Sequence, residues 1–282
     1  MLPNCILNGV AKSGTTALYR YLNEHPDVFM SSTKELNYFA YSEDLVDNKT
    51  NNTFHATTLE DYGKFFDSAG ASVVRGEASP LYFSSEIAAA NIKRVIPDVK
   101  LITTLRNPVD RAYSGYLMRY RKGRASDDLY AEMTPDRHHV RNGFYYENLQ
   151  RYYNLFSDSQ IQVVLFDELH SDTATVVNNI YKWLGVSEAS NIDFSKRYNS
   201  GYVPKNHLTH NLLRVKHLLP NSIRKRTPDT LRNKFKFLEN KNKLAAPKLP
   251  QDLRSQLIEL YNSDIQKVQD LIDRDLSHWL QV

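Results

Sequence analysis

A short turn rich in glycine and hydroxyl residues follows the first apolar segment of the chain. Residues 9–16 read GVAKSGTT and lie between a strand pattern at 5–10 and a helical pattern at 15–25. Backbone N–H groups in such a turn point into one concavity, and the helix dipole favours an anion there. Lysine adds charge and threonine hydroxyls add donors. The predicted phosphate ligands are Lys12, Ser13, Gly14, Thr15 and Thr16.

The turn differs from the P-loop of nucleotide kinases, in which the lysine follows the second glycine. Here Lys12 precedes Gly14. The kinase site also needs an aspartate that holds magnesium, and Asp167, after an apolar segment, is only a weak candidate. A small-molecule kinase and a purely structural turn stay open as alternatives, and the sequence predicts no metal.

A second candidate anion site follows the apolar segment 100–105. Arg106 comes directly after it, and Ser114 comes about two turns into the next helical pattern, 108–121. Open α/β sheets bind ligands at the carboxyl ends of their strands. A guanidinium and a hydroxyl placed there could meet one phosphate.

The elements that must position these residues alternate along the chain. Strands are expected at 5–10, 72–75, 100–105 and 161–166, and helices at 15–25, 84–96, 108–121, 145–156, 173–184 and 251–280. Alternation of this kind favours a P-loop-like three-layer α/β/α fold with a central parallel sheet. We expect one domain over 1–282, with a polar excursion at 33–58 and a basic, mostly helical part from about residue 200.

Charge and cysteine content limit the function classes. The net charge is +4, yet the segment 205–248 holds twelve Lys or Arg residues against two acids. That asymmetry indicates an anionic ligand and leaves a polyanion-binding module without catalysis as an alternative. The lone cysteine, Cys5, excludes an intrachain disulfide. With no run of 18 apolar residues and no signal peptide before the first strand, we expect a cytoplasmic protein or a trimmed lumenal catalytic domain.

Four histidines could suggest a metal site. No cysteine or carboxylate with ligand spacing lies near them, so surface histidines are the favoured interpretation. They are His138, His139, His207 and His210.

Taken together, residues 9–16 and 106–116 resemble the nucleotide-binding signature of the sulfotransferase family. Three further segments resemble its carbohydrate branch, which includes the heparan sulfate N- and O-sulfotransferases and bacterial relatives. Residues 34–39, KELNYF, resemble a K-E-x-H-F-F segment, and residues 76–83, GEASPLYF, resemble an E-K-[ST]-P-x-Y-F segment. Residues 143–152 resemble a G-x-Y-x-x-x-L-x-x-[WY] helix. The resemblance covers about residues 4–185.

The resemblance implies in-line transfer of a sulfuryl group from 3′-phosphoadenosine 5′-phosphosulfate (PAPS) to a hydroxyl or amine, without a metal. Lys12 would neutralise the leaving phosphate, and the loop after it would hold the 5′-phosphate. Arg106 and Ser114 would bind the 3′-phosphate. No nucleic-acid partner is implied.

The family's carbohydrate branch takes its general base from the K-E segment, which is Glu35 here, and Glu77 is the second choice. Weaker candidates for substrate binding are Glu77, Tyr145 and Lys205; the last belongs to 199–205, which resembles a late glycine-basic loop. The chain departs from the branch at Ala78, where a lysine is usual, and at Asn37, where a histidine is usual. The acceptor is expected to be a carbohydrate or similar hydroxylated molecule.

Overall fold

The computed structural model describes residues 1–42, 54–188, 192–194, 202–206, 237–238 and 241–282. Much of the basic segment 205–248 lies outside these residues, as do His207 and His210. The predicted helical character of that part therefore stays a prediction.

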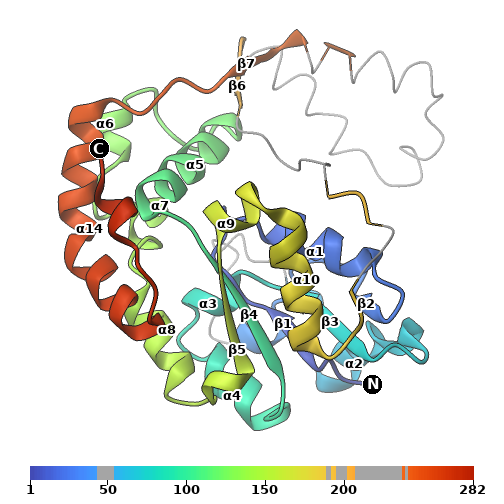
Figure 1. Ribbon diagram of the computed structural model, residues 1–282. Coiled ribbons are helices and arrows are strands. Elements are labelled where there is room, and N and C mark those ends of the chain that lie inside the picture. The colour runs from blue at the N-terminus through green and yellow to red at the C-terminus, as the bar shows by residue number, and fades with distance from the viewer. Residues whose placement is uncertain (43–53, 189–191, 195–201, 207–236, 239–240) are drawn as a thin grey trace.

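A five-stranded parallel sheet forms the centre of the described part (Figure 1). Its order is β2-β3-β1-β4-β5, so β1 lies between β3 and β4. The strands are β1 (Cys5–Leu7), β2 (Val28–Met30), β3 (Val74–Ala78), β4 (Lys100–Leu105) and β5 (Ile161–Leu165). All neighbours pair in parallel, and the predicted central parallel sheet is confirmed.

The strand predictions differ from the structure in four places. The strand expected at 161–166 ends at Leu165, because Phe166 begins a helix. The strand expected at 5–10 ends at Leu7, although the N–H groups of Asn8 and Val10 still donate to β4 carbonyls. The strand expected at 72–75 runs over Val74–Ala78. β2 was not predicted, because three residues are too few for an apolar pattern to emerge.

Helices and short turns cover the sheet and extend beyond it. The α-helices are α1 (Thr15–Glu24), α2 (Leu59–Lys64), α3 (Leu81–Ser84), α4 (Ala88–Val95), α5 (Pro108–Arg121), α6 (Leu129–Glu132), α7 (His138–Arg141), α8 (Tyr146–Tyr153), α9 (Phe166–Ser171), α10 (Thr173–Leu184) and α14 (Gln251–Ile272). The 3₁₀ turns are η1 (Tyr38–Ala40), η3 (Asp67–Ala69), η4 (Asp158–Gln160) and η6 (Ser277–Leu280). Outside this sheet, β6 (Tyr202–Pro204) and β7 (Lys243–Ala245) pair as a separate two-stranded antiparallel sheet.

Successive residues of the central strands point to opposite faces of the sheet, and both faces are buried. Ile6 and Leu101 pack with α4 and with Tyr152 of α8 on one side. Leu7 and Ile102 pack with α1 and α10 on the other side. The period of two in a strand sends these neighbours to opposite layers, and three layers result.

A third apolar cluster lies beyond the sheet. Tyr261 and Val268 of α14 pack there against α5, α7 and α8 (Figure 1). The single helix expected at 251–280 is instead α14 followed by η6, because Asp273 adopts a left-handed conformation with φ of 49° that ends the helix. The surface prediction was wrong for His139, which is buried with its Cβ against Gly115. Burial lowers the pKa of His139 to about 4.

The close approach of Gly9 to β4 generates a stability prediction. A Cβ at Gly9 would lie 2.1 Å from the backbone nitrogen of Thr104, so Gly9→Ala must push the phosphate loop away from the sheet. We expect a loss of about 2 kcal/mol or more in the free energy of unfolding, measured by urea denaturation. The control is Gly63→Ala in α2, where the nearest atom is 3.5 Å away. Equal stabilities of the two variants would contradict the steric argument.

Candidate active site

The predicted phosphate loop is the turn between β1 and α1, at the carboxyl end of a central strand. Lys12 and Gly14 adopt positive φ angles of 77° and 88°, which fold the backbone over the start of the helix. No side chain caps α1, so its first N–H groups stay available to an anion. The Ser13 hydroxyl is buried and has no hydrogen-bond partner among the described residues. Leaving such a group unsatisfied is costly, and a phosphate oxygen would satisfy it.

Lys12 lies half-buried in a group of cations. Burial, followed in size by the charges of Arg121, Arg106 and Lys122, lowers the pKa of Lys12 to about 8. Neither Lys12 nor Arg106 forms an ion pair with a carboxylate in the part of the chain that the structure describes. Lys12 and its cationic neighbours repel one another, and an anionic ligand bound among them relieves that repulsion.

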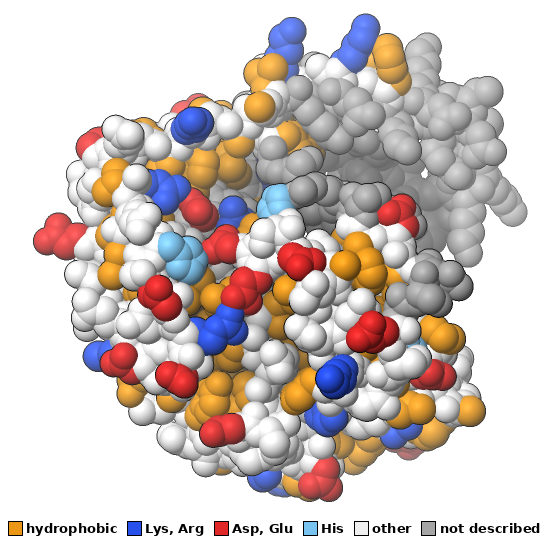
Figure 2. All heavy atoms as spheres, viewed as in Figure 1, with side chains coloured by type: hydrophobic (Ala, Val, Ile, Leu, Met, Phe, Trp, Pro, Cys, Tyr) orange, Lys and Arg blue, Asp and Glu red, His pale blue; other side chains and the backbone are white. Residues whose placement is uncertain are grey.

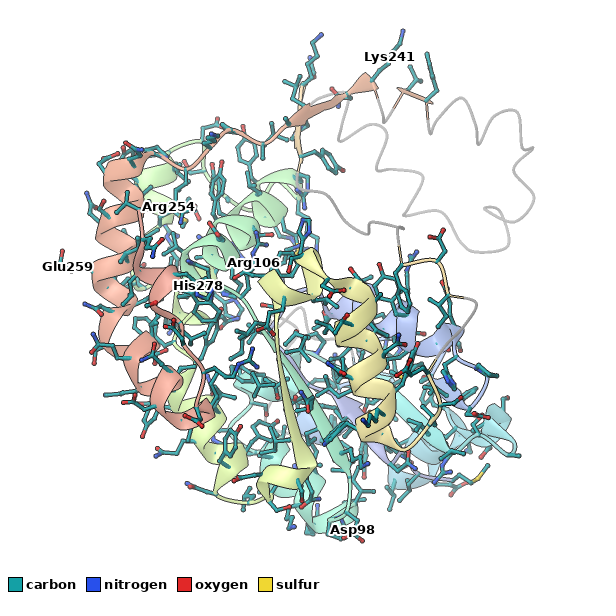
Figure 3. All side chains as sticks on the ribbon, viewed as in Figure 1. Asp98, Arg106, Lys241, Arg254, Glu259 and His278 are labelled. Atoms are coloured by element: carbon teal, nitrogen blue, oxygen red, sulfur yellow. The ribbon has the colours of Figure 1, made fainter. Side chains whose placement is uncertain are left out.

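Arg106 follows β4 directly and lies at the end of that strand remote from Asp98 (Figure 3). Its guanidinium carbon is 4.5 Å from the centre of the Phe166 ring, and its Nη1 donates to the Lys12 carbonyl at 3.4 Å. These two contacts hold the guanidinium beside the phosphate loop. Its other N–H groups remain as donors for a ligand.

α5 begins two residues after Arg106 and carries Ser114 in its second turn. Asn107 caps the helix by accepting from the N–H groups of Val109 at 3.0 Å and Asp110 at 3.4 Å. Ser114 is half-buried, and no hydrogen bond of its hydroxyl is found in the described part of the chain. Arg121 lies seven residues further on and therefore on the same helix face; it donates to the Tyr202 carbonyl of β6 at 2.8 Å.

Glu35 reaches the same edge of the sheet from another segment. Its side chain is exposed, its φ is 62°, and its N–H donates to the carbonyl of Ala78 at 2.9 Å. Ala78 ends β3, which is paired directly with β1. The structure thus places Glu35 at the carboxyl end of the strand next to the phosphate loop.

Glu77 has surroundings of a different kind. It is fully buried, and its Oε1 accepts from the hydroxyls of Tyr62 at 2.6 Å and Tyr82 at 2.8 Å. Its Oε2 accepts from Ser79 at 2.7 Å. Burial raises the pKa of this carboxyl, and the three hydroxyl donors partly offset that effect. Both oxygens are therefore engaged within the protein.

The hydroxyls on Glu77 hold the segment that carries Glu35. The Ser79 hydroxyl accepts from the N–H of Asn37 at 3.1 Å, and the Tyr82 hydroxyl accepts from the N–H of Phe39 at 3.4 Å. Each hydroxyl donates to the carboxylate and accepts from the backbone, so Glu77 fixes the direction of both bonds. This geometry favours a positioning role for Glu77 and an exposed, reactive role for Glu35.

Tyr145 and Lys205 have different settings. Tyr145 is buried and its hydroxyl donates to the Arg106 carbonyl at 2.9 Å, so it supports the arginine. Lys205 follows β6 with an exposed side chain, and its N–H donates to the Asn242 carbonyl at 2.8 Å. No described bond joins Lys205 to the phosphate loop.

The sequence did not predict the hydrogen bonds that Trp279, near the C-terminal end, makes beside the site. The Nδ2 of Asn107 donates to the Trp279 carbonyl at 3.2 Å, and the Trp279 indole donates to Asp167 at 3.1 Å. Trp279 thereby links Asn107, which follows Arg106, to Asp167, which follows Phe166. Residues 107 and 279 are 172 positions apart, and no local sequence pattern signals such a contact.

Known proteins with similar sequences and structures identify the family to which this chain belongs. A model of the sulfotransferase domain matches residues 2–199. The chain belongs to the sulfotransferase family. That confirms the resemblance seen in the phosphate loop and in the Arg106 segment, and it identifies the fold as that of sulfotransferases.

Several curated proteins and solved structures resemble this sulfotransferase. It is 31% identical over 211 residues to the bifunctional heparan sulfate N-deacetylase/N-sulfotransferase 4 of Mus musculus, a match covering 66% of this chain and 22% of that protein. It is 36% identical over 118 residues to the membrane-associated sulfotransferase kil1 of Dictyostelium discoideum, covering 41% and 22%. A crystal structure of a sulfotransferase from Alicyclobacillus acidocaldarius superposes with a TM-score of 0.74 at 25% identity over the whole of both chains. The chain spans less than a quarter of the length of these two curated relatives.

Proposed function

We propose that this sulfotransferase transfers the sulfuryl group of PAPS to an acceptor hydroxyl or amine. The main support is the direct contact between the two candidate anion sites, in which Arg106 donates to the backbone carbonyl of Lys12. PAPS carries a 5′-phosphosulfate and a 3′-phosphate, and each site suits one of them. The buried, unpaired Ser13 hydroxyl and the uncapped start of α1 suit the 5′-phosphate.

The roles of the donor-side residues follow from their surroundings. Lys12 holds a positive charge beside the bond to the leaving phosphate, where negative charge develops. Gly14, Thr15 and Thr16 present N–H groups and hydroxyls at the helix start. Arg106 and Ser114 bind the 3′-phosphate through the guanidinium and the hydroxyl.

Glu35 is the proposed general base. An alcohol or amine attacks sulfur only once its proton can leave, and a carboxylate within reach of the acceptor takes that proton. Glu35 is exposed at the edge of the sheet, whereas Glu77 is fully buried with both oxygens occupied. These two environments support Glu35 as the base.

The acceptor is proposed to be a glycan. This proposal draws on the relatives named for heparan sulfate N-sulfotransferase activity. It also draws on the exposed position of Glu35, which suits a polymer that approaches from solvent. The described helices include none long and apolar enough to span a bilayer. The cytoplasmic location stays a prediction of the sequence.

The alternatives gain less support. The magnesium role of a kinase aspartate would fall to Asp167, but that carboxylate accepts from the Trp279 indole and lies 3.5 Å from His278. A binding module without catalysis would need a basic surface. On the face shown in Figure 2, acidic and basic side chains intermingle over the described residues. Most of the basic segment 205–248 lies outside those residues, so the binding module stays an alternative.

The donor proposal is tested with two nucleotides that differ by one phosphate. The wild type should bind 3′-phosphoadenosine 5′-phosphate (PAP) at least about 100-fold more tightly than 5′-AMP, because a paired phosphate contributes several charge-assisted bonds. Arg106→Ala should lose most of this preference in isothermal titration calorimetry. Arg94→Ala, on the exposed side of α4, is the control. A preference that survives in Arg106→Ala would place the 3′-phosphate elsewhere.

The low pKa of Lys12 predicts a pH dependence of PAP binding. In the free protein Lys12 loses its proton near pH 8, and a bound 5′-phosphate favours the charged form, so binding takes up a proton above that pH. The PAP Kd should therefore rise about tenfold from pH 7 to pH 9. In Lys12→Met this rise should vanish and turnover should fall about 100- to 1,000-fold. An unchanged pH profile in Lys12→Met would remove Lys12 from the site.

The base assignment predicts a loss of turnover without a loss of donor binding. Glu35→Gln keeps the shape of the side chain but cannot accept a proton, so kcat should fall about 100-fold or more. Its PAP Kd should stay within about threefold of wild type. The assay follows label from PAPS into N-desulfated heparin, with the exposed Glu86→Gln as control. Normal turnover by Glu35→Gln would exclude it as the base.

A further inference from the structure

Lys34 is a third cation near this site, and it belongs to neither the phosphate loop nor the Arg106 segment. It precedes Glu35, and its Nζ donates to the Oγ1 of Thr16 at 3.0 Å. Thr16 is the second residue of α1. The ammonium therefore lies where the segment bearing the proposed base meets the proposed 5′-phosphate loop.

The surroundings of Lys34 hold its ammonium in place. Nζ lies 5.4 Å from the centre of the Tyr19 ring, and the Tyr19 hydroxyl donates to the Ser31 carbonyl at 2.7 Å. Lys34 forms no ion pair among the described residues, although Glu35 is its neighbour in the chain. Burial lowers the pKa of Lys34, Glu35 raises it and Arg20 lowers it. An ammonium has three donors, and the bond to Thr16 uses one.

Two segments of the chain meet at Glu35, and Lys34 is their one basic residue. The segments 31–41 and 78–84 meet where the Glu35 N–H bonds to the Ala78 carbonyl. Neither segment contains any other lysine or arginine. Any positive charge that these two segments bring to the reacting group must therefore come from Lys34.

We propose that Lys34 is a further catalytic residue, which binds a non-bridging oxygen of the sulfuryl group during its transfer. The inference rests on the proposed function. The bond between sulfur and the bridging oxygen of the 5′-phosphate breaks, and its electron pair stays on that oxygen beside Lys12. The acceptor oxygen or nitrogen bonds to sulfur, and its proton passes to Glu35. Lys34, between Thr16 and Glu35, stabilises the negative charge on the sulfuryl oxygens.

The sulfuryl group is present in PAPS and absent from PAP, so the two nucleotides isolate this contact. Lys34→Met keeps the aliphatic stem against Tyr19 and removes the charge. We expect its Kd for PAPS to rise about tenfold and its Kd for PAP to change less than about threefold. Turnover with N-desulfated heparin should fall about 100-fold, and Lys34→Arg should recover part of the PAPS affinity.

Two further variants serve as controls for folding and for the loss of a half-buried lysine elsewhere. Lys34→Gln, which keeps a polar end toward Thr16, should show the same selective loss of PAPS affinity if Lys34→Met folds poorly. Lys93→Met is the matched control, because Lys93 is also half-buried, with its Nζ 5.1 Å from the Phe156 ring, but lies on α4. It should bind both nucleotides as the wild type does.

The outcomes separate the two proposals. Equal losses of PAPS and PAP affinity in the Lys34 variants would mean that Lys34 acts only through Thr16 and the loop, and would overturn the inference. Unchanged affinity for both nucleotides together with unchanged turnover would overturn it as well. A wild-type protein that binds neither PAP nor PAPS would instead overturn the proposed function.

Discussion

Positive charge held close to one helix N-terminus is the constraint around which this site is arranged. Lys12 and Arg106 are partly buried, and burial lowers the pKa of each. Charges of one sign repel one another in a medium that screens them poorly. The arrangement is therefore unfavourable by itself, and the surrounding structure has to hold it in place. An anion bound among these groups adds an attraction to each of them.

The sheet and the residues near the C-terminal end together hold the phosphate loop and Arg106 in place. β1 and β4 are neighbours, so the phosphate loop and Arg106 leave the sheet side by side. Gly9 permits the loop to lie against Thr104 without a gap. Trp279 then links Asn107 to Asp167, the residues that follow Arg106 and Phe166 in the chain. The donor side is thus held by contacts between residues distant in sequence, and the turn η6 supplies two of them through Trp279.

Much of this arrangement was predictable from sequence, and the rest was not for identifiable reasons. Pro108–Arg121 and Thr173–Leu184 were predicted at their observed bounds, because proline opens the first and Gly185 ends the second. The phosphate loop and Arg106 were found because local patterns place both at strand ends. Trp279 and β2 were missed, since one acts at long range and the other is three residues long. The positioning role of Glu77 was also missed, because burial and hydroxyl partners cannot be read from a motif.

The two carboxylates on the acceptor side show how environment divides one residue type between two roles. Glu77 lies within β3 and is surrounded by hydroxyls that deliver their protons to it, so it serves as a fixed acceptor. Glu35 lies two hydrogen bonds away, through Ser79 and the Asn37 backbone, with its own carboxylate exposed. The positive φ angle at Glu35 is strained for a residue of this type, whereas Asn37 tolerates the left-handed conformation. The buried network offsets that strain by fixing the backbone, and it presents the exposed carboxylate at the edge of the sheet where we propose that the acceptor arrives.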